Sequence, residues 1–185
     1  MTKVLVPLAN GFEEIEATTI IDVLRRGGIE VVTASIHDVL NVKGAHGIEM
    51  SADTRLADVF SEMFDAIVLP GGGEGTENLK NSEMVRDILR KHGQIGILLC
   101  AICAAPIVLV EAGVIAPNTH ITCYPTCQMM LDRPWTPAPV VADGNIITGQ
   151  APGVSTLFAL VVLKALAGDK IVSKVAREMV TDVLD

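Results

Sequence analysis

The chain has 185 residues, of which 50% are hydrophobic and only 3% are aromatic. It carries 14 Lys and Arg against 22 Asp and Glu, so the formal net charge is −8. This aliphatic composition, with a mean hydropathy of +0.46, excludes an intrinsically disordered chain. The negative charge argues against nucleic acid or an anionic membrane as a partner. The length is that of one domain, and we predict a single domain over residues 1–185.

No segment is typical of a targeting or membrane-spanning sequence. Glu13 and Glu14 follow the first apolar run directly, which is not the pattern of a signal peptide. The longest apolar run, residues 95–110, contains Pro106 and is shorter than the ~20 residues of a spanning helix. The 4 cysteines are too few for a disulfide scaffold. We therefore expect a soluble, cytoplasmic protein with reduced thiols.

Short aliphatic runs alternate with longer amphipathic ones along the chain, as expected for alternating strands and helices. The first half predicts a strand over residues 3–8, a helix over 13–26, a strand over 30–35, a small hairpin within 37–52 and a strand over 65–69. The second half predicts a helix over 82–92, a strand over 95–100, a helix over 104–112, a β-like segment over 120–123, a hairpin of 140–142 with 145–148, and helices over 154–167 and 170–183.

Strands that are apolar on both faces and alternate with helices predict a mostly parallel sheet with helices on both sides. This is a doubly wound α/β fold. The active groups of such a fold lie in loops at the carboxyl ends of its strands. Three of these loops have unusual chemistry, and they follow the predicted strands that end at Leu8, Leu69 and Cys100.

The loop around Cys103 carries the strongest chemical signal. A predicted strand meets a predicted helix almost directly, and Ala101, Ala104 and Ala105 let the two backbones approach closely. Pro106 is tolerated only in the first turn of a helix, so we expect the helix to begin near Cys103. Cys103 would then lie at a corner similar to a nucleophile elbow. Amides at the helix start would lower its pKa below the ordinary value of about 8.5. A buried, inert cysteine is the alternative.

Two further loops are expected to flank this corner. Residues 70–75 read Pro-Gly-Gly-Gly-Glu-Gly, without the spacing of a phosphate-binding loop, and their amides are candidates for an oxyanion hole. In the loop after residue 8, Glu13 and Glu14 complement the dipole of the next helix. Glu16 lies one turn further on. If Glu16 points into a pocket, its pKa is raised and it can exchange protons near neutral pH. The alternative is a solvated carboxylate at the helix start, with an ordinary pKa and no role in proton transfer.

The cysteines and histidines suggest two other kinds of site. The four cysteines form a Cys-x2-Cys pair and, after 19 intervening residues, a Cys-x3-Cys pair, which is close to the spacing of a zinc ribbon. The polar, glycine-containing knuckles of such sites are missing, and Cys100 and Cys103 are expected on opposite faces of the sheet, so we predict no metal. None of the 4 histidines is placed to activate Cys103, so the sequence does not support a Cys-His-Asp hydrolase.

Four ordered motifs resemble the ThiJ/PfpI superfamily. They are residues 13–16 (EEIE), 22–28 (DVLRRGG), 68–72 (VLPGG) and 101–106 (AICAAP), and a late Ala-Pro-Gly run before an aliphatic helix fits as well. The resemblance covers essentially the whole chain. It is greatest to the branch that contains the parkinsonism-associated protein deglycase and its bacterial relatives. It implies a flavodoxin-like sheet and a homodimer.

The resemblance also implies roles for individual residues. Cys103 matches the oxidisable nucleophile of the family, and Glu16 matches the carboxyl group that hydrogen-bonds its sulfur. Arg26 matches a position linked to the dimer contact. The candidates for the oxyanion pocket and for substrate binding are Gly71, Gly72, Ala104 and Tyr124, with the amides of Gly72 and Ala104 as the oxyanion donors. The resemblance implies no cofactor and no metal ligand.

Three positions depart from patterns in the superfamily. This chain has Tyr124 before a proline where many relatives carry a pocket histidine, which excludes general-base catalysis by that histidine. It has His46 where relatives carry an arginine, which puts anion stabilisation across the dimer in doubt. Ala104 follows Cys103 where the protease branch has a histidine, which argues against protease activity.

These residues support two functions of different classes. In the first, the Cys103 thiolate adds to the carbonyl of glyoxal, methylglyoxal or a glycated side chain, Glu16 shuttles the proton and no cofactor is needed. In the second, oxidation of the same thiol to sulfenic and sulfinic acid switches a partner or client interaction, as in a redox sensor or chaperone without turnover. An inert α/β domain is the third reading.

Overall fold

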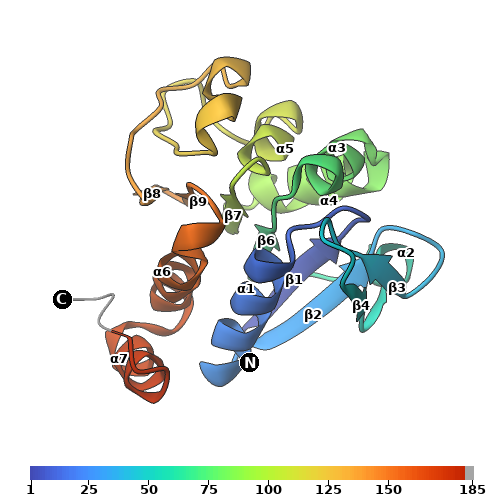
Figure 1. Cartoon of the computed structure of the whole chain (residues 1–185). Coiled ribbons are helices and arrows are strands. Elements are labelled where there is room, and N and C mark those ends of the chain that lie inside the picture. Colours follow the sequence, from blue (N-terminus) through green and yellow to red (C-terminus); the bar gives the residue numbers. More distant parts are fainter. Residues whose placement is uncertain (182–185) are drawn as a thin grey trace.

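A seven-stranded sheet runs through the middle of the molecule, between two layers of helices (Figure 1). The computed structural model describes residues 1–181 of the chain. The strand order is β5-β2-β1-β6-β7-β9-β8, and only the edge pair β8–β9 is antiparallel. The strands are β1 (Lys3–Leu8), β2 (Glu30–Ser35), β5 (Thr54–Arg55), β6 (Ala66–Leu69), β7 (Leu98–Ile102), β8 (Val140–Asp143) and β9 (Ile146–Gly149). The predicted doubly wound, mostly parallel sheet is confirmed.

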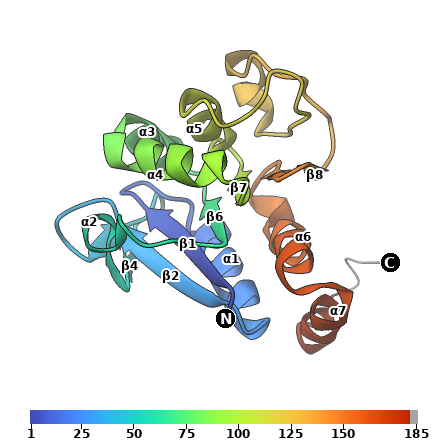
Figure 2. The same ribbon diagram turned by 180° about the vertical axis from the view of Figure 1, so that it is seen from behind.

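The helices divide between the two faces of this sheet (Figures 1 and 2). One face is covered by α1 (Glu14–Arg26), α6 (Ser155–Ala167) and α7 (Asp169–Glu178). The other is covered by α2 (Leu56–Val59), α3 (Gly73–Asn81), α4 (Glu83–Gln94) and α5 (Pro106–Glu111). None of the helices in residues 1–181 combines the length and the apolar composition needed to cross a membrane.

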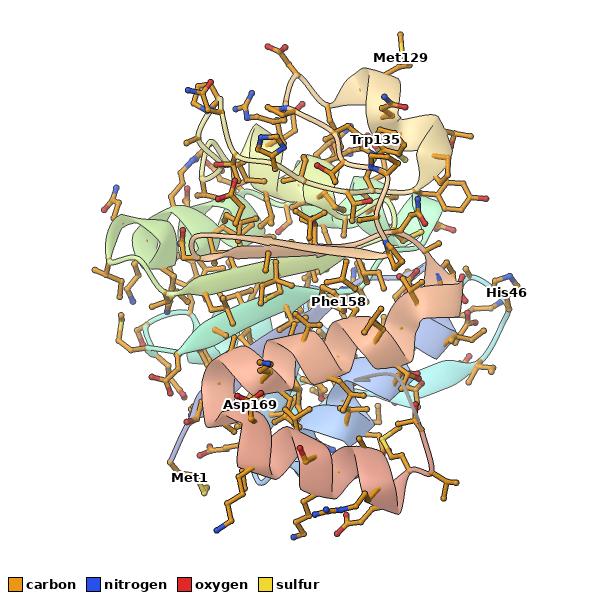
Figure 3. The ribbon with its side chains drawn as sticks, turned by 90° about the vertical axis from the view of Figure 1, so that its left-hand side faces the viewer. Met1, His46, Met129, Trp135, Phe158 and Asp169 are labelled. Carbon is orange, nitrogen blue, oxygen red and sulfur yellow. The ribbon has the colours of Figure 1, made fainter. Side chains whose placement is uncertain are left out.

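Alternating strand residues build a hydrophobic core on each side of the sheet. On β1, Val4 and Val6 pack on the α1–α6–α7 side, whereas Leu5 packs on the α3–α4–α5 side. All three side chains are fully buried, as expected for a central parallel strand. Phe158 of α6 fills the first core between helix and sheet (Figure 3). The two cores hold the loops at the carboxyl ends of the strands in a fixed arrangement.

The β7–α5 corner differs in detail from the prediction. The strand begins at Leu98 and not at residue 95, because Gly96 turns the chain with a φ of 73° and leaves Ile95 59% exposed. The strand then extends to Ile102, and α5 begins only at Pro106, where the missing N–H of proline costs no helical hydrogen bond. Cys103 therefore directly follows the strand, and a tight turn separates it from the helix.

Several other elements were predicted imperfectly. Helix α3 was missed, because its first residues belong to the glycine-rich run that predicted a loop. Residues 120–123 form only an isolated bridge between Ile121 and Trp135, not a strand. The hairpin within 37–52 exists as a separate two-stranded sheet of β3 (Asn41–Lys43) and β4 (Glu49–Ser51). The last helix ends at Glu178, and the predicted end at residue 183 lies outside the described residues. The short 3-10 helices η1 and η2 span Pro125–Met130 and Pro152–Val154.

Candidate active site

Three loops meet where β1, β6 and β7 end. The loop after β1 is tied to the loop after β6 by two backbone hydrogen bonds: Glu13 N–H donates to Gly71 O at 3.0 Å, and Gly75 N–H donates to Gly11 O at 3.0 Å. Gly71 also lies so close to the β7 corner that a Cβ there would be 2.8 Å from Cys103 Cβ. The three loops that the sequence singled out therefore form one site.

Cys103 has a strained backbone at the centre of this site. Its φ is 63°, a left-handed conformation that costs a non-glycine residue on the order of 1–3 kcal/mol. The strain is held on both sides, because Cys103 N–H donates to Gly149 O at 2.9 Å and Cys103 O accepts from Tyr124 N–H at 2.8 Å. Only 8% of the residue is exposed. A strained, nearly buried cysteine at a strand end is typical of a functional position.

Glu16 reaches the same point from α1 and is fully buried. Its Oε2 accepts a hydrogen bond from Gly71 N–H at 2.7 Å, and its carboxyl group interacts with the Cys103 thiol. Its other oxygen, Oε1, is buried without a conventional hydrogen-bond partner among the described residues. The solvated arrangement of Glu16 is therefore excluded, and one carboxyl oxygen is free to take a proton.

Two backbone amides favour the charged form of the sulfur. The N–H groups of Gly72 and Ala104 lower the pKa of Cys103, against the effect of burial. They come from two different loops, and neither belongs to α5, which starts at Pro106. The predicted stabilisation by helix-start amides is thus replaced by stabilisation from loop amides. Such a pair of converging donors is the geometry of an oxyanion hole.

The pKa of Glu16 shifts in the predicted direction, whereas the pKa of Cys103 does not. Burial raises the pKa of Glu16 to about 7, as expected for a carboxyl that points into the protein. Burial and the Glu16 carboxylate raise the pKa of Cys103 to about 12, against the opposing effect of the two amides. The expected lowering of the Cys103 pKa is therefore wrong for a sulfur beside an ionised Glu16. Near neutral pH the thiol keeps its proton, and Glu16 is the adjacent base that can accept it.

Tyr124 and Arg26, the other predicted site residues, do not join the pair of Cys103 and Glu16 through their side chains. Tyr124 contacts the site through its backbone, and the residue is 41% exposed. Arg26 lies on the exposed side of α1, away from the sulfur, and pairs with Asp22 at 2.6 Å. A polar hollow of about 540 Å³ opens beside Gly11 and Glu74, but Cys103 does not line it.

Glu13 and Glu14 stand at the start of α1, where they were predicted to complement the helix dipole, and both are largely buried. Glu13 and Glu14 are 9% and 5% exposed, because the loop between β3 and β4 folds over the start of α1. Glu14 Oε1 accepts the His46 N–H at 2.6 Å, and Oε2 lies 2.9 Å from His46 Nδ1. The sequence placed three carboxylates near one helix start, and only the packing decides their burial.

The cysteines do not group as a zinc ribbon would require. Within residues 1–181 no metal-ligating cluster includes a cysteine. Cys100 and Cys103 border the same hydrophobic core and not opposite faces, because the left-handed φ of Cys103 breaks the alternation of the strand. Gly149 was not predicted at all, although it holds the Cys103 N–H. No local signal distinguishes this glycine from others in strands.

The conformation of Gly72 gives a direct prediction. Its φ is 92°, and a Cβ at this position would be 2.2 Å from Gly11 O and 2.7 Å from Glu13 N. We expect Gly72→Ala to lower the free energy of unfolding by about 2 kcal/mol or more, since both backbone strain and a backbone clash act. The matched control is Gly73→Ala, because a Cβ at Gly73 would meet nothing within 4 Å. Urea unfolding compares the two; equal stabilities would show that the loop is not held as described.

Sequence comparison identifies relatives over most of the chain. The sequence model of the DJ-1/PfpI family matches residues 2–165. Protein dj-1beta of Drosophila melanogaster is 42% identical over 176 residues, which is 94% of both chains. The glutathione-independent glyoxalase DJR-1.2 of Caenorhabditis elegans is 34% identical over 159 residues, covering 84% of this chain and 83% of the relative. Against DJ-1 homolog B of Arabidopsis thaliana, the match at 39% identity spans 90% of this chain but only 38% of the longer plant protein.

Solved structures agree with the sequence matches. The crystal structure of Drosophila melanogaster DJ-1beta superposes with a TM-score of 0.93 at 39% identity, covering 97% of this chain and 98% of that one. Oxidized Toxoplasma gondii DJ-1 superposes with a TM-score of 0.94 at 34% identity, covering 98% of this chain and 100% of that one. Fold and sequence thus point to the same group of proteins.

Proposed function

The chain belongs to the DJ-1/PfpI family, and from that premise we propose that it is a cysteine-dependent, cofactor-free enzyme that converts small reactive aldehydes to hydroxy acids. The observation that carries the proposal is the buried pair of Cys103 and Glu16, in which the carboxyl group has a pKa of about 7. A relative that is 34% identical is named a glutathione-independent glyoxalase. Glyoxal, methylglyoxal and early glycation adducts on Cys, Lys or Arg side chains are the proposed substrates.

The geometry supports a short sequence of steps. As the Cys103 sulfur bonds to the aldehyde carbon, Glu16 accepts the thiol proton and the carbonyl electron pair moves onto oxygen. The amides of Gly72 and Ala104 hold that oxygen while it is negative. Glu16 then returns its proton to that oxygen, which gives the hemithioacetal and frees the carboxylate. Glu16 next moves a proton from the former aldehyde carbon to the neighbouring ketone carbon, while the hydroxyl proton passes to the ketone oxygen, which leaves a hydroxy thioester. Water hydrolyses the thioester, so methylglyoxal and water give lactate and the free thiol returns.

The proposal is tested with purified protein and no added thiol. Methylglyoxal consumption is followed together with lactate formation, and glyoxal is tested for conversion to glycolate. We expect stoichiometric conversion of each aldehyde to its hydroxy acid. A folded protein that consumes neither aldehyde would refute the enzymatic proposal.

A second candidate function is redox sensing through the same sulfur. The observation that favours it is the unpartnered Glu16 Oε1, since a protonated carboxyl there would donate to a Cys103 sulfinate. Two equivalents of peroxide convert the thiol to sulfinic acid and release two of water. We expect mass spectrometry after mild peroxide to find two oxygens on Cys103 before Cys127, the partly exposed cysteine, is oxidised. Oxidation of Cys127 first would count against a sensor.

A homodimer is the third part of the proposal. Two exposed apolar residues, Ile15 at 58% and Ile48 at 61%, border one small apolar hollow between α1 and the β3–β4 loop. Arg26 extends the same helix and remains the proposed polar contact. We expect the mass of a dimer in sedimentation, and the mass of a monomer after Ile15→Asp, because a carboxylate would be buried against the partner. A wild-type protein that sediments as a monomer would refute the proposed homodimer.

A further inference from the structure

Three possible metal ligands converge next to the proposed catalytic pair without belonging to it. Glu13 and Glu14 stand at the start of α1, and His46 comes from the loop between β3 and β4. Figure 3 shows His46 at the edge of the molecule. His46 Nδ1 lies 2.9 Å from Glu14 Oε2 and 3.7 Å from Glu13 Oε2. One ligand atom from each residue falls within 4.8 Å of the other two. The three side chains thus face one point from two elements distant in the sequence.

This cluster places two largely buried carboxyl side chains beside one exposed histidine. The side chains of Glu13 and Glu14 are only 12% and 7% exposed. In residues 1–181 no hydrogen-bond donor meets the Glu13 carboxylate, and its nearest ionic partner is the His46 ring at 3.7 Å. A protonated histidine balances one carboxylate, whereas the other is offset only by the dipole of α1, at whose start both stand. Carboxylates in this condition attract a further cation, because partly buried charge is costly without a partner.

Glu14 is already held as a metal ligand would be. Its Oε1 accepts the backbone N–H groups of His46 and Ile48, at 2.6 Å and 3.3 Å, which leaves Oε2 directed at the cluster. The loop is fixed by Ala45 N–H, which donates to Phe12 O at 2.9 Å. Hydrogen bonds that orient a ligating carboxylate are typical of the outer shell of metal sites.

We propose that Glu13, Glu14 and His46 form a binding site for a divalent transition-metal ion of the zinc type. With metal–ligand bonds of ~2.0–2.2 Å, neighbouring ligands of a tetrahedral ion lie about 3.3 Å apart. The two nitrogen–oxygen distances of 2.9 Å and 3.7 Å bracket that value, and all three ligand atoms lie within 4.8 Å of one another, so side-chain rotations are enough to seat the ion. Three protein ligands leave one position of a tetrahedral ion for a further ligand.

The donor set decides which ions fit. An imidazole nitrogen with two carboxylate oxygens suits Zn²⁺, Co²⁺ or Cu²⁺, whereas Mg²⁺ and Ca²⁺ prefer oxygen ligands alone and Cu⁺ prefers sulfur. The bound ion connects the start of α1 to the β3–β4 loop and therefore stabilises the folded chain by mass action.

Calorimetric titration with Zn²⁺ at pH 8 tests the site. The full chain carries Cys103→Ala and Cys127→Ala, since Cys100 and Cys123 are fully buried, whereas Cys103 is 8% exposed and Cys127 is partly exposed. We expect one equivalent of Zn²⁺ to bind and to raise Tm. Removal of a ligand should weaken binding by at least about tenfold in Glu13→Gln and about a hundredfold in His46→Ala, with no gain in Tm in the latter.

The matched control is His120→Ala, which removes another surface histidine and should bind like the parent. Thermal unfolding without metal shows that each variant is folded before titration. The site is refuted if the parent binds no Zn²⁺ saturably. It is equally refuted if Glu13→Gln and His46→Ala bind as tightly as the parent, because the ion would then lie elsewhere.

Discussion

Cys103→Ala is expected to lower kcat/KM for methylglyoxal by at least about a thousandfold, which corresponds to about 4 kcal/mol of transition-state stabilisation. The physical reason is that no other group in the site can form the carbon–sulfur bond; the amides of Gly72 and Ala104 stabilise an oxyanion only after attack. The fold should be kept, because alanine fits the space of a small side chain that is 8% exposed. Lactate formation at fixed protein concentration measures the effect.

Cys127→Ala is the matched control for this variant. Cys127 is a partly exposed thiol in η1 and takes no part in the proposed steps, so its removal should leave kcat/KM within about twofold of the wild type. If Cys103→Ala turns over methylglyoxal at the wild-type rate, the aldehyde is not handled by this nucleophile and the proposed function is wrong. If both variants lose activity together, the loss reports on the fold and not on the chemistry.

Glu16→Gln is expected to lower kcat/KM by about 10²–10⁴-fold, the usual contribution of a general acid–base group. Glutamine can still accept the Gly71 N–H, but it cannot take the thiol proton. In the wild type, kcat/KM should rise with pH through about 7, as the carboxyl becomes ionised and able to accept a proton. The residual activity of the variant should lack this ionisation. The rates are measured from pH 5 to 9 with EDTA, so that no bound cation alters the local charge.

The same substitution has a pH-dependent effect on stability. The folded-state pKa of Glu16 is raised from 4.5 to about 7, so its contribution is fully present below pH 4.5 and is lost as the pH rises through 7. The loss amounts to about 3 kcal/mol, since ionisation of a buried carboxyl is resisted by the fold. Between pH 4.5 and 8, the stability of Glu16→Gln relative to the wild type should therefore improve by about 3 kcal/mol.

Urea unfolding of both proteins at the two pH values measures this difference, in which titrating groups distant from Glu16 cancel. Glu83→Gln, which makes the same exchange at an exposed position at the start of α4, is the control for the substitution itself. A constant difference between Glu16→Gln and the wild type would mean that Glu16 ionises normally in the folded protein. The assignment of Glu16 as the proton acceptor would then fail.

Much of the fold could be predicted because its signals are local. Aliphatic strands such as residues 3–8 and 65–69, separated by amphipathic segments, predicted the parallel sheet and its two helical layers. Pro106, with small residues before it, located the sharp corner at Cys103 to within a few residues. The four motifs predicted the family, and the family match over residues 2–165 confirmed that resemblance.

Local signals failed where glycine and strain were involved. The glycine-rich run after β6 predicted a loop, yet Gly73 already begins α3. Packing of later residues such as Leu79 stabilises the helix and offsets the low helix propensity of the glycines at its start. The left-handed φ of Cys103 was not predictable either. It is imposed from outside, by hydrogen bonds to Gly149 and Tyr124.

The sequence by itself determined which residues stand at the carboxyl ends of the strands, since strand periodicity and turn residues are encoded among neighbours. Only the tertiary structure decided their charge states. The sequence separated Glu16 from Glu13 and Glu14 by one helical turn but left open whether Glu16 is buried. In the structure Glu16 is dehydrated against Gly71, 55 residues away, and Glu14 against His46, 32 residues away. Desolvation depends on every chain segment that covers a group, and these segments come from distant parts of the sequence. The pKa values, and with them the proposed chemistry, therefore follow from packing.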